Sequence, residues 1–185
     1  MTDRESLRRL LLERSVQRGD FVLASGRRSS YYIDCRPTTM SAEGLTVIGR
    51  MGWDLIRQNG WRPAGVGGLT LGADPVAYAI AAASWSSGQP VNAFTVRKEA
   101  KGHGAGRLIE GNFRSGDSVV VVEDVITSGE SAARAAAAIE QAGGTVLGVL
   151  AVVDREQGGK GALEAGGRRV LTLVTAGELG LGDLS

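Results

Sequence analysis

The sequence has little of several residue types that define other protein classes. Among 185 residues there are one cysteine, Cys35, and one histidine, His103. A lone cysteine forms no disulfide within the chain. Because the histidine lies far along the chain, we interpret Cys35 as an ordinary reduced thiol rather than a nucleophile. No long apolar run near Met1 resembles a signal peptide or a membrane span.

Charge of one sign is not in excess either. Lysine and arginine number 21, and aspartate and glutamate number 20. A balanced chain creates no global positive field that would draw it to nucleic acid or to an anionic membrane. We therefore expect a cytoplasmic protein with no nucleic-acid partner and no membrane partner, whose basic residues act locally.

The length and the 43% of hydrophobic residues allow one well-buried domain, which we expect to span residues 1–185. Valine-rich apolar runs alternate with helical stretches. The predicted strands are 64–69, 91–96, 119–122, 145–153 and 170–174, and the predicted helices are 42–59, 75–87 and 131–142. Continuous apolar strands separated by helices predict an α/β fold with a central parallel sheet flanked by helices.

The first 40 residues follow a different pattern. Thr2 and Glu5 have the spacing of a capping box, and three leucines follow on one helical face, which predicts a short amphipathic helix. Ser25 and Gly26 then separate two short extended pieces, which predicts a hairpin. We expect this part to form a small appendage to the sheet.

The strongest functional signal is the string VVVVEDVITSG, from Val119 to Gly129. Its valines predict a buried strand that ends at Val122, and ligands of open α/β sheets bind beyond such ends. The loop that follows offers backbone N–H groups, hydroxyls and a helix N-terminus, which suit a phosphate. Glu123 and Asp124 are acceptors and suit sugar hydroxyls or a hydrated metal ion.

Two other interpretations of the string are possible. The acidic pair could belong to a nucleotide hydrolase, but that requires a phosphate-binding loop G-x-x-x-x-G-K-[ST]. The nearest match, 67–72, continues with Ala73 and Asp74 and lacks the lysine, so we discard this alternative. A purely structural role would have the carboxylates solubilise a strand end and Ser128 cap the helix, and Ser128 can do so in either case.

The same string resembles the phosphoribosyl pyrophosphate (PRPP) signature of the type I phosphoribosyltransferases. The resemblance implies that fold, with a small N-terminal hood largely within residues 1–40. It also implies that the acidic pair contacts the ribose hydroxyls, with Asp124 as a catalytic residue, and that the loop holds the 5-phosphate. The PRPP-binding segment would comprise Glu123, Asp124, Val125, Ile126, Thr127, Ser128, Gly129, Glu130 and Ser131.

A basic, glycine-rich segment, RKEAKGHGAG, covers 97–106. Cation clusters are usually solvated faces and lone histidines are usually structural, but a loop without apolar periodicity fits a mobile anion-binding segment better. It looks like the catalytic loop of orotate phosphoribosyltransferases. The resemblance implies a homodimer in which the loop 97–107 acts in trans, with Arg97 and the catalytic residues Lys101 and His103 on pyrophosphate. Lys98 would contact pyrophosphate within its own subunit.

The segment 21–36 is similar to the hood of that family, which covers the base. Orotate carries a carboxylate, so its pocket needs N–H donors and preferably an arginine. The resemblance implies orotate contacts from Arg155 and Thr127, with Ser25 and Gly26 from the hood. Taken alone, the pair Asp154-Arg155 would fit a surface ion pair equally well.

Two positions depart from the best-known family pattern. Ala24 stands where many members have a lysine in the hood, and Leu71 stands where some members have a lysine in the loop 67–72. The contacts of those two lysines are therefore not carried over to this chain. Other members have a Gly-x-Asp-Pro version of the second loop, which matches 72–75 here. We therefore expect backbone amides of Thr70 to Gly72 to face the pyrophosphate.

The resemblance implies that the protein transfers phosphoribosyl from PRPP to orotate, which yields orotidine 5'-monophosphate in pyrimidine synthesis. Magnesium would be bound mainly by PRPP and water, with no metal site made by protein residues alone. Three alternatives remain. They are a phosphoribosyltransferase for uracil or a purine, a PRPP-sensing regulator without catalysis, and an unrelated sugar-phosphate-binding protein.

Overall fold

The structure is a computed structural model that describes residues 2–22, 28–99 and 108–181. The helices are α1 (Asp3–Arg14), α2 (Arg36–Thr39), α3 (Ala42–Gln58), α4 (Ala73–Ser86), α5 (Glu130–Gln141), α6 (Gly159–Ala165) and the 3-10 turn η1 (Gly177–Leu179). The strands are β1 (Val16–Val22), β2 (Arg28–Ile33), β3 (Gly65–Leu69), β4 (Asn92–Val96), β5 (Ile109–Gly111), β6 (Ser118–Ile126), β7 (Thr145–Asp154) and β8 (Val170–Thr175).

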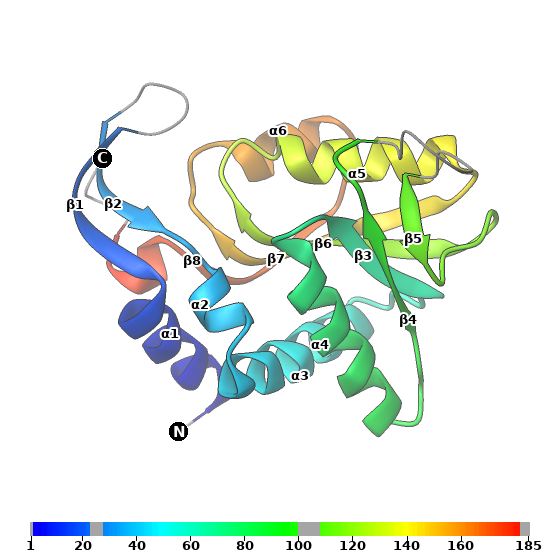
Figure 1. Cartoon of the computed structure of the whole chain (residues 1–185), viewed down its shortest axis with the longest axis horizontal. Coiled ribbons are helices and arrows are strands. Elements are labelled where there is room, and N and C mark those ends of the chain that lie inside the picture. The colour runs from blue at the N-terminus through cyan, green and yellow to red at the C-terminus, as the bar shows by residue number, and fades with distance from the viewer. Residues whose placement is uncertain (1, 23–27, 100–107, 182–185) are drawn as a thin grey trace.

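Six strands form the central sheet, in the order β5-β4-β3-β6-β7-β8. All neighbouring pairs are parallel except β4 and β5. Helices α5 and α6 cover one face and α1 to α4 lie against the other (Figure 1). The predicted α/β class, with a parallel sheet flanked by helices, is therefore confirmed.

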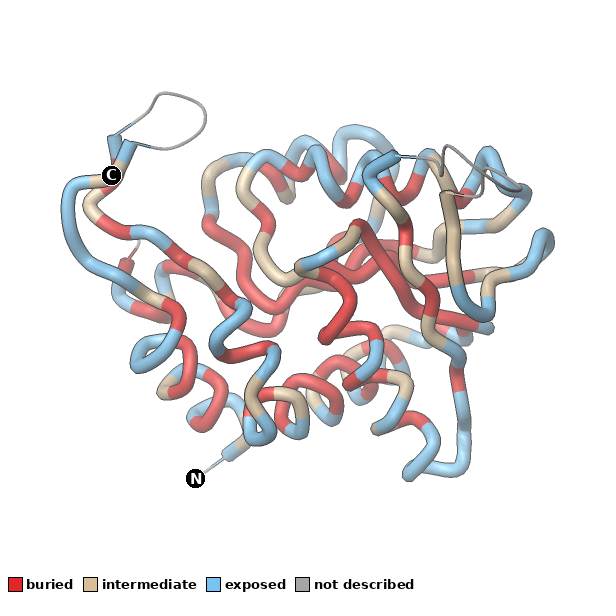
Figure 2. The backbone as a smooth tube through the Cα atoms, viewed as in Figure 1, coloured by how far each residue is buried: buried red, intermediate tan, exposed pale blue. Residues whose placement is uncertain are grey.

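Side-chain alternation along β6 explains why both faces are apolar. Val120 and Val122 pack into a core with residues of α3 and α4, such as Ile48. Val119 and Val121 pack into a second core with Ala135 and other residues of α5. A strand buried on both faces has no polar side to show, and this is the origin of its continuous valine run. Figure 2 shows this buried layer through the middle of the molecule.

The first residues form the expected appendage. The capping box of α1 is present, with Glu5 N–H donating to Thr2 Oγ1 at 3.2 Å and Thr2 N–H donating to Glu5 Oε2 at 2.7 Å. The hairpin of β1 and β2 pairs Val16 with Ile33 in antiparallel register. It stands beside β8 at the end of the sheet opposite β5 (Figure 1).

Several elements differ from the sequence prediction. Strand β6 does not end at Val122 but continues to Ile126, because its backbone keeps pairing with β7. Helix α5 begins at Glu130 rather than 131, and α4 begins at Ala73 rather than 75. Helices α2 and α6 and the short strand β5 were not predicted. None of the described helices is long and apolar enough to cross a membrane.

Candidate functional site

The loops singled out in the sequence lie at one edge of the sheet. Because β3, β4, β6 and β7 are parallel, their carboxyl ends face the same way. The segments that follow are 70–72 after β3, 97–99 after β4, 127–129 after β6 and Arg155 after β7. Such an edge is where open α/β sheets bind ligands.

The acidic pair lies inside the last part of β6, which corrects the prediction that it follows the strand. Glu123 is paired with Ala151 of β7 and is 6% exposed. Its Oε2 atom has no hydrogen-bond partner among the described residues. Asp124 is half-buried, and its Oδ1 accepts from the N–H of Val125 at 2.9 Å.

Burial perturbs the pKa of both carboxyls. Burial, and then the negative charge of Asp124, raise the pKa of Glu123 to about 9. Burial is also the main cause that raises the pKa of Asp124. The folded protein thus holds two acceptors at the sheet edge whose charged forms are poorly stabilised by protein groups. A ligand that brings hydroxyl donors or a cation would supply what is missing.

The loop after β6 encloses a small cavity of about 100 Å³, lined by Glu123 and by residues 125–132. Gly129 has a φ of 81° and is the residue that caps α5, so Ser128 is not the cap that the sequence suggested. Ser128 Oγ instead accepts from Glu130 N–H at 3.4 Å. The first N–H groups of α5 therefore border the cavity, an arrangement suited to a phosphate.

Two glycines allow this loop to form. A Cβ atom at Gly129 would lie 2.9 Å from the carbonyl oxygen of Gly159, at the start of α6. A Cβ atom at Gly159 would lie 2.4 Å from the carbonyl oxygen of Thr127. Helix α6, which the sequence did not predict, thus packs against the loop after β6 and holds it in place.

Arg155 is buried next to the acidic strand. Its backbone N–H donates to the carbonyl of Ile126 at 3.0 Å, and the residue is 6% exposed. The guanidinium lies over the ring of Tyr31, 4.9 Å from its centroid, while Nε and Nη2 have no hydrogen-bond partner among the described residues. A buried guanidinium with free donors is suited to binding an anion.

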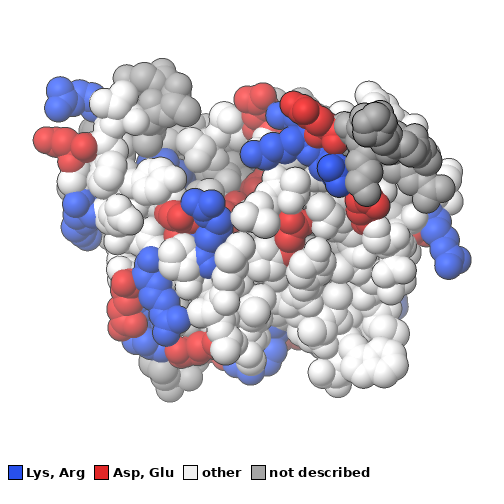
Figure 3. All heavy atoms as spheres, viewed as in Figure 1, with Lys and Arg blue, Asp and Glu red and all other residues white. Residues whose placement is uncertain are grey.

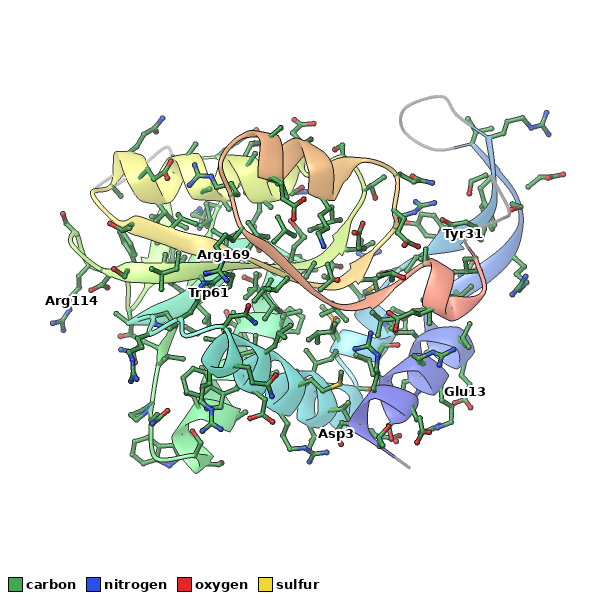
Figure 4. All side chains as sticks on the ribbon, turned by 180° about the vertical axis from the view of Figure 1, so that it is seen from behind. Asp3, Glu13, Tyr31, Trp61, Arg114 and Arg169 are labelled. Atoms are coloured by element: carbon green, nitrogen blue, oxygen red, sulfur yellow. The ribbon has the colours of Figure 1, made fainter. Side chains whose placement is uncertain are left out.

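Tyr31 was not among the predicted site residues. It is a buried residue of β2 (Figure 4), and its contact with the Arg155 guanidinium brings the hood against that residue. Only its position beside the predicted hood turn could have suggested it. Cys35 is fully buried nearby, and burial, followed by the charge of Asp124, raises its thiol pKa. A buried neutral thiol agrees with the interpretation that Cys35 is not a nucleophile.

A larger cavity, of about 580 Å³, lies at the opposite edge of the sheet. It is lined by Trp53, Trp61 and Pro90, near the amino ends of β3 and β4. Figure 4 shows Trp61 and Arg169 far from Tyr31. None of the predicted site residues that the structure describes lines this cavity. We place the site at the carboxyl edge, where Glu123 Oε2 and two nitrogens of Arg155 are buried without a hydrogen-bond partner among the described residues.

Comparison with known proteins shows close relatives over nearly the whole chain. An orotate phosphoribosyltransferase of Aquifex aeolicus is 45% identical over 182 residues, which cover 97% of this chain and 98% of the relative. One of Mycobacterium avium is 47% identical over 178 residues, which cover 96% and 97%. The chain belongs to the orotate phosphoribosyltransferase family.

Solved structures of the orotate phosphoribosyltransferase family have the same fold. The Mycobacterium tuberculosis enzyme in complex with PRPP matches with a TM-score of 0.82 and 42% identity, over 97% of this chain and all of that one. Its complex with Fe(III) dicitrate matches with a TM-score of 0.87 and 46% identity, over the same shares. The chain matches none of the models in a scan of protein families.

The basic loop that resembles this family's catalytic loop is described only at its ends. Arg97 Nη1 lies 3.7 Å from Glu110 Oε1 of β5. The backbone N–H of Arg97 donates to the carbonyl of Leu108 at 2.8 Å. The carbonyl of Lys98 accepts from Arg134 of α5 at 3.2 Å. The remaining predicted residues of this loop and of the hood turn lie outside the described residues; they are Lys101, His103, Ala24, Ser25 and Gly26.

Proposed function

We propose that this chain transfers the 5-phosphoribosyl group of PRPP to orotate, which gives orotidine 5'-monophosphate and pyrophosphate for pyrimidine synthesis. One observation carries the proposal. A buried acceptor, Glu123, and a buried donor, Arg155, stand on neighbouring strand ends, and each has polar atoms without a hydrogen-bond partner among the described residues. Sugar hydroxyls satisfy the first and the orotate carboxylate satisfies the second.

PRPP would lie along the sheet edge. The 5-phosphate takes the cavity bordered by 127–131, and the ribose hydroxyls donate to Glu123 and Asp124. The pyrophosphate then reaches the loop 70–72 and the basic loop after β4. Lys98 would contact the pyrophosphate that is bound in its own subunit. Three residues, Arg97, Lys101 and His103, would act on the pyrophosphate of the neighbouring subunit.

Orotate would lie between the hood and the end of β7. Arg155 donates to the ring carboxylate or ring oxygens, and Tyr31 holds its guanidinium in place by stacking at 4.9 Å. Thr127 contributes a hydroxyl near the base, and Ser25 and Gly26 cover it from the hood turn. This pocket selects an anionic base over uracil, because an uncharged base would leave the buried guanidinium without a partner.

The residues at this edge fit a magnesium ion that PRPP and water hold for the most part. Among the described residues, no group of three or more potential ligands gathers. Glu123 and Asp124 are hard oxygen donors, and they would hold ribose hydroxyls or water on the ion. Bound magnesium neutralises charge on the pyrophosphate and orients it.

The reaction needs no protein nucleophile. Orotate N1 attacks the anomeric carbon as the bond to pyrophosphate breaks, so positive charge develops on the ribose ring and negative charge on the leaving group. In this proposal Asp124 would stabilise the positive charge on the ribose ring. Lys101 and His103 would stabilise the negative charge on the leaving group when the basic loop closes, in a site with less water, where each charge counts for more.

The assembly is part of the proposal. A homodimer would let each basic loop reach its neighbour's pyrophosphate, and α4 offers a surface for contact, with Tyr78 55% and Trp85 75% exposed. Figure 3 shows that the face over α4 is largely uncharged. We further propose that residues 1–185 act as one domain in the cytoplasm, with no nucleic acid and no membrane as partner.

Orotate absorbance tests the proposal. The purified protein is mixed with PRPP and magnesium, and orotate, uracil and hypoxanthine are supplied in parallel. We expect a magnesium-dependent loss of the orotate band with formation of orotidine 5'-monophosphate, and no turnover of the other two bases. Turnover of uracil or hypoxanthine instead would assign another base. Tight PRPP binding without turnover would favour a PRPP-sensing regulator.

A further inference from the structure

Asp74 is a buried carboxylate that the proposed chemistry does not use. It is the second residue of α4 and is 8% exposed. An aspartate in the first turn of a helix usually lies near solvent at the positive end of the helix dipole. Here both carboxylate oxygens of Asp74 instead accept hydrogen bonds from side chains of other segments.

The carboxylate connects two strand ends with α4. Its Oδ2 accepts from the hydroxyl of Thr70, just after β3, at 2.7 Å, and its Oδ1 accepts from the hydroxyl of Thr95 in β4 at 2.8 Å. The hydroxyl of Tyr78 lies 3.3 Å from Thr95 Oγ1. Because the only hydroxyl hydrogen of Thr95 points to Asp74, Tyr78 is the donor of this third bond.

The loop held in this way lies directly against the acidic pair. A Cβ atom at Gly72 would lie 2.5 Å from Asp124 Oδ1, so only a glycine allows the backbone to come this close. Leu71 is apolar and 53% exposed, so the loop 70–72 carries no cation. Among the described residues, the N–H groups of Leu71 and Gly72 donate to no backbone carbonyl. Any contact of this loop with an anion therefore depends on where its backbone lies.

We propose that Asp74 is a positioning residue for the pyrophosphate. The N–H of Thr70 donates to the carbonyl of Val96 at 2.8 Å, so the free N–H groups of this loop are those of Leu71 and Gly72. By holding Thr70 and Thr95 together, Asp74 fixes these two groups beside Asp124. Through Thr95 it also holds the strand from which the basic loop begins at Arg97. This inference rests on the proposed function, and it adds a residue that acts through the loop without touching the substrate.

The test compares Asp74→Ala with Asp74→Asn and with Asp117→Ala. Asp117 is a matched control, because it also accepts a hydrogen bond, from Arg114 N–H at 2.8 Å, but lies in the turn before β6 at the opposite edge. Initial rates give the KM values for PRPP and orotate, and calorimetry with inorganic pyrophosphate and magnesium gives a Kd. Urea denaturation shows whether each variant is folded.

We expect Asp74→Ala to raise the KM for PRPP and the Kd for pyrophosphate by about tenfold or more, equivalent to about 1.4 kcal/mol. The KM for orotate should change by less than about twofold, because Arg155 lies on another strand end. Asp74→Asn keeps one acceptor and should recover part of the affinity, while Asp117→Ala should leave both constants unchanged. If Asp74→Ala does not fold, Thr70→Val and Thr95→Val remove the two bonds singly and should each weaken pyrophosphate binding.

A purely structural role for Asp74 would lower stability and the active fraction while leaving both KM values and the Kd at their wild-type levels, and this result would overturn the inference. An equal rise in both KM values would do the same. If the wild-type protein turns over no orotate, the proposed function fails, and the Kd for pyrophosphate alone then decides the role of Asp74.

Discussion

Replacing Glu123 with glutamine should make the free protein more stable at alkaline pH. The buried carboxyl has a pKa of about 9 in the folded protein, against an ordinary value of 4.5. Between these values the folded protein holds a proton that the unfolded chain has released, so folding becomes less favourable as pH rises. The stabilising effect of this proton is complete below pH 4.5 and is lost as pH rises to about 9.

The size of the effect follows from proton linkage. One proton difference changes the free energy of unfolding by about 1.4 kcal/mol per pH unit. Glu123 is only 6% exposed, so solvent screens it little. From pH 6 to pH 8, the wild-type protein should therefore lose up to about 3 kcal/mol relative to Glu123→Gln. The glutamine amide adds a constant offset, so the slope with pH is the quantity to compare.

Urea denaturation without ligands, followed by fluorescence of the three tryptophans, measures this slope. Glu164→Gln is the matched control, because Glu164 is an exposed carboxylate, with a side-chain exposure of 48%. The difference between Glu123→Gln and wild type should grow with pH, while the control should run parallel to wild type. Parallel lines for Glu123→Gln as well would refute the account of the buried carboxyl. The same variant should bind PRPP more weakly, because the amide cannot lose a proton when the ribose hydroxyls bind and so lacks the second acceptor oxygen of a carboxylate.

Three further predictions concern the rest of the site. Arg155→Leu should raise the KM for orotate by about 10- to 100-fold, because one charged hydrogen bond is lost. The control Arg169→Leu removes a guanidinium that lies 5.3 Å from the Trp61 ring and should leave this KM unchanged. Equal effects of the two variants on the KM for orotate would contradict the assignment. Lys101→Ala should lower the single-turnover rate by about 100-fold or more with little change in orotate binding, and an unchanged rate would exclude its role. Gly129→Ala should lower the free energy of unfolding in urea by about 1 kcal/mol more than Gly116→Ala does. Both glycines have a positive φ, but an added Cβ atom would be crowded only at Gly129. Equal losses of stability in the two variants would show that backbone strain alone matters.

The failures of the sequence prediction have identifiable causes. Strand β5 has three residues and is paired with β4 in antiparallel register, so it is too short for a periodic signal. Helix α6 begins at Gly159 and is preceded by Gly158 as its N-cap, and glycine disfavours a helix. Strand β6 continues through two carboxylates because β7 supplies its backbone partners. In each case a tertiary contact outweighs the local preference.

The sequence by itself determined the elements whose signal is contained in one segment. Valine runs buried on both faces mark the central strands, and the segment 123–131 carries the acidic pair and the loop in consecutive residues. Only the tertiary structure decided which distant groups meet. It buries Glu123 with an Oε2 atom that has no hydrogen-bond partner in the described part of the chain. It also places Arg155 over the ring of Tyr31 in the hood and joins Thr70 and Thr95 through Asp74. The physical reason is that burial and hydrogen bonding between segments depend on sheet order, which no local pattern encodes.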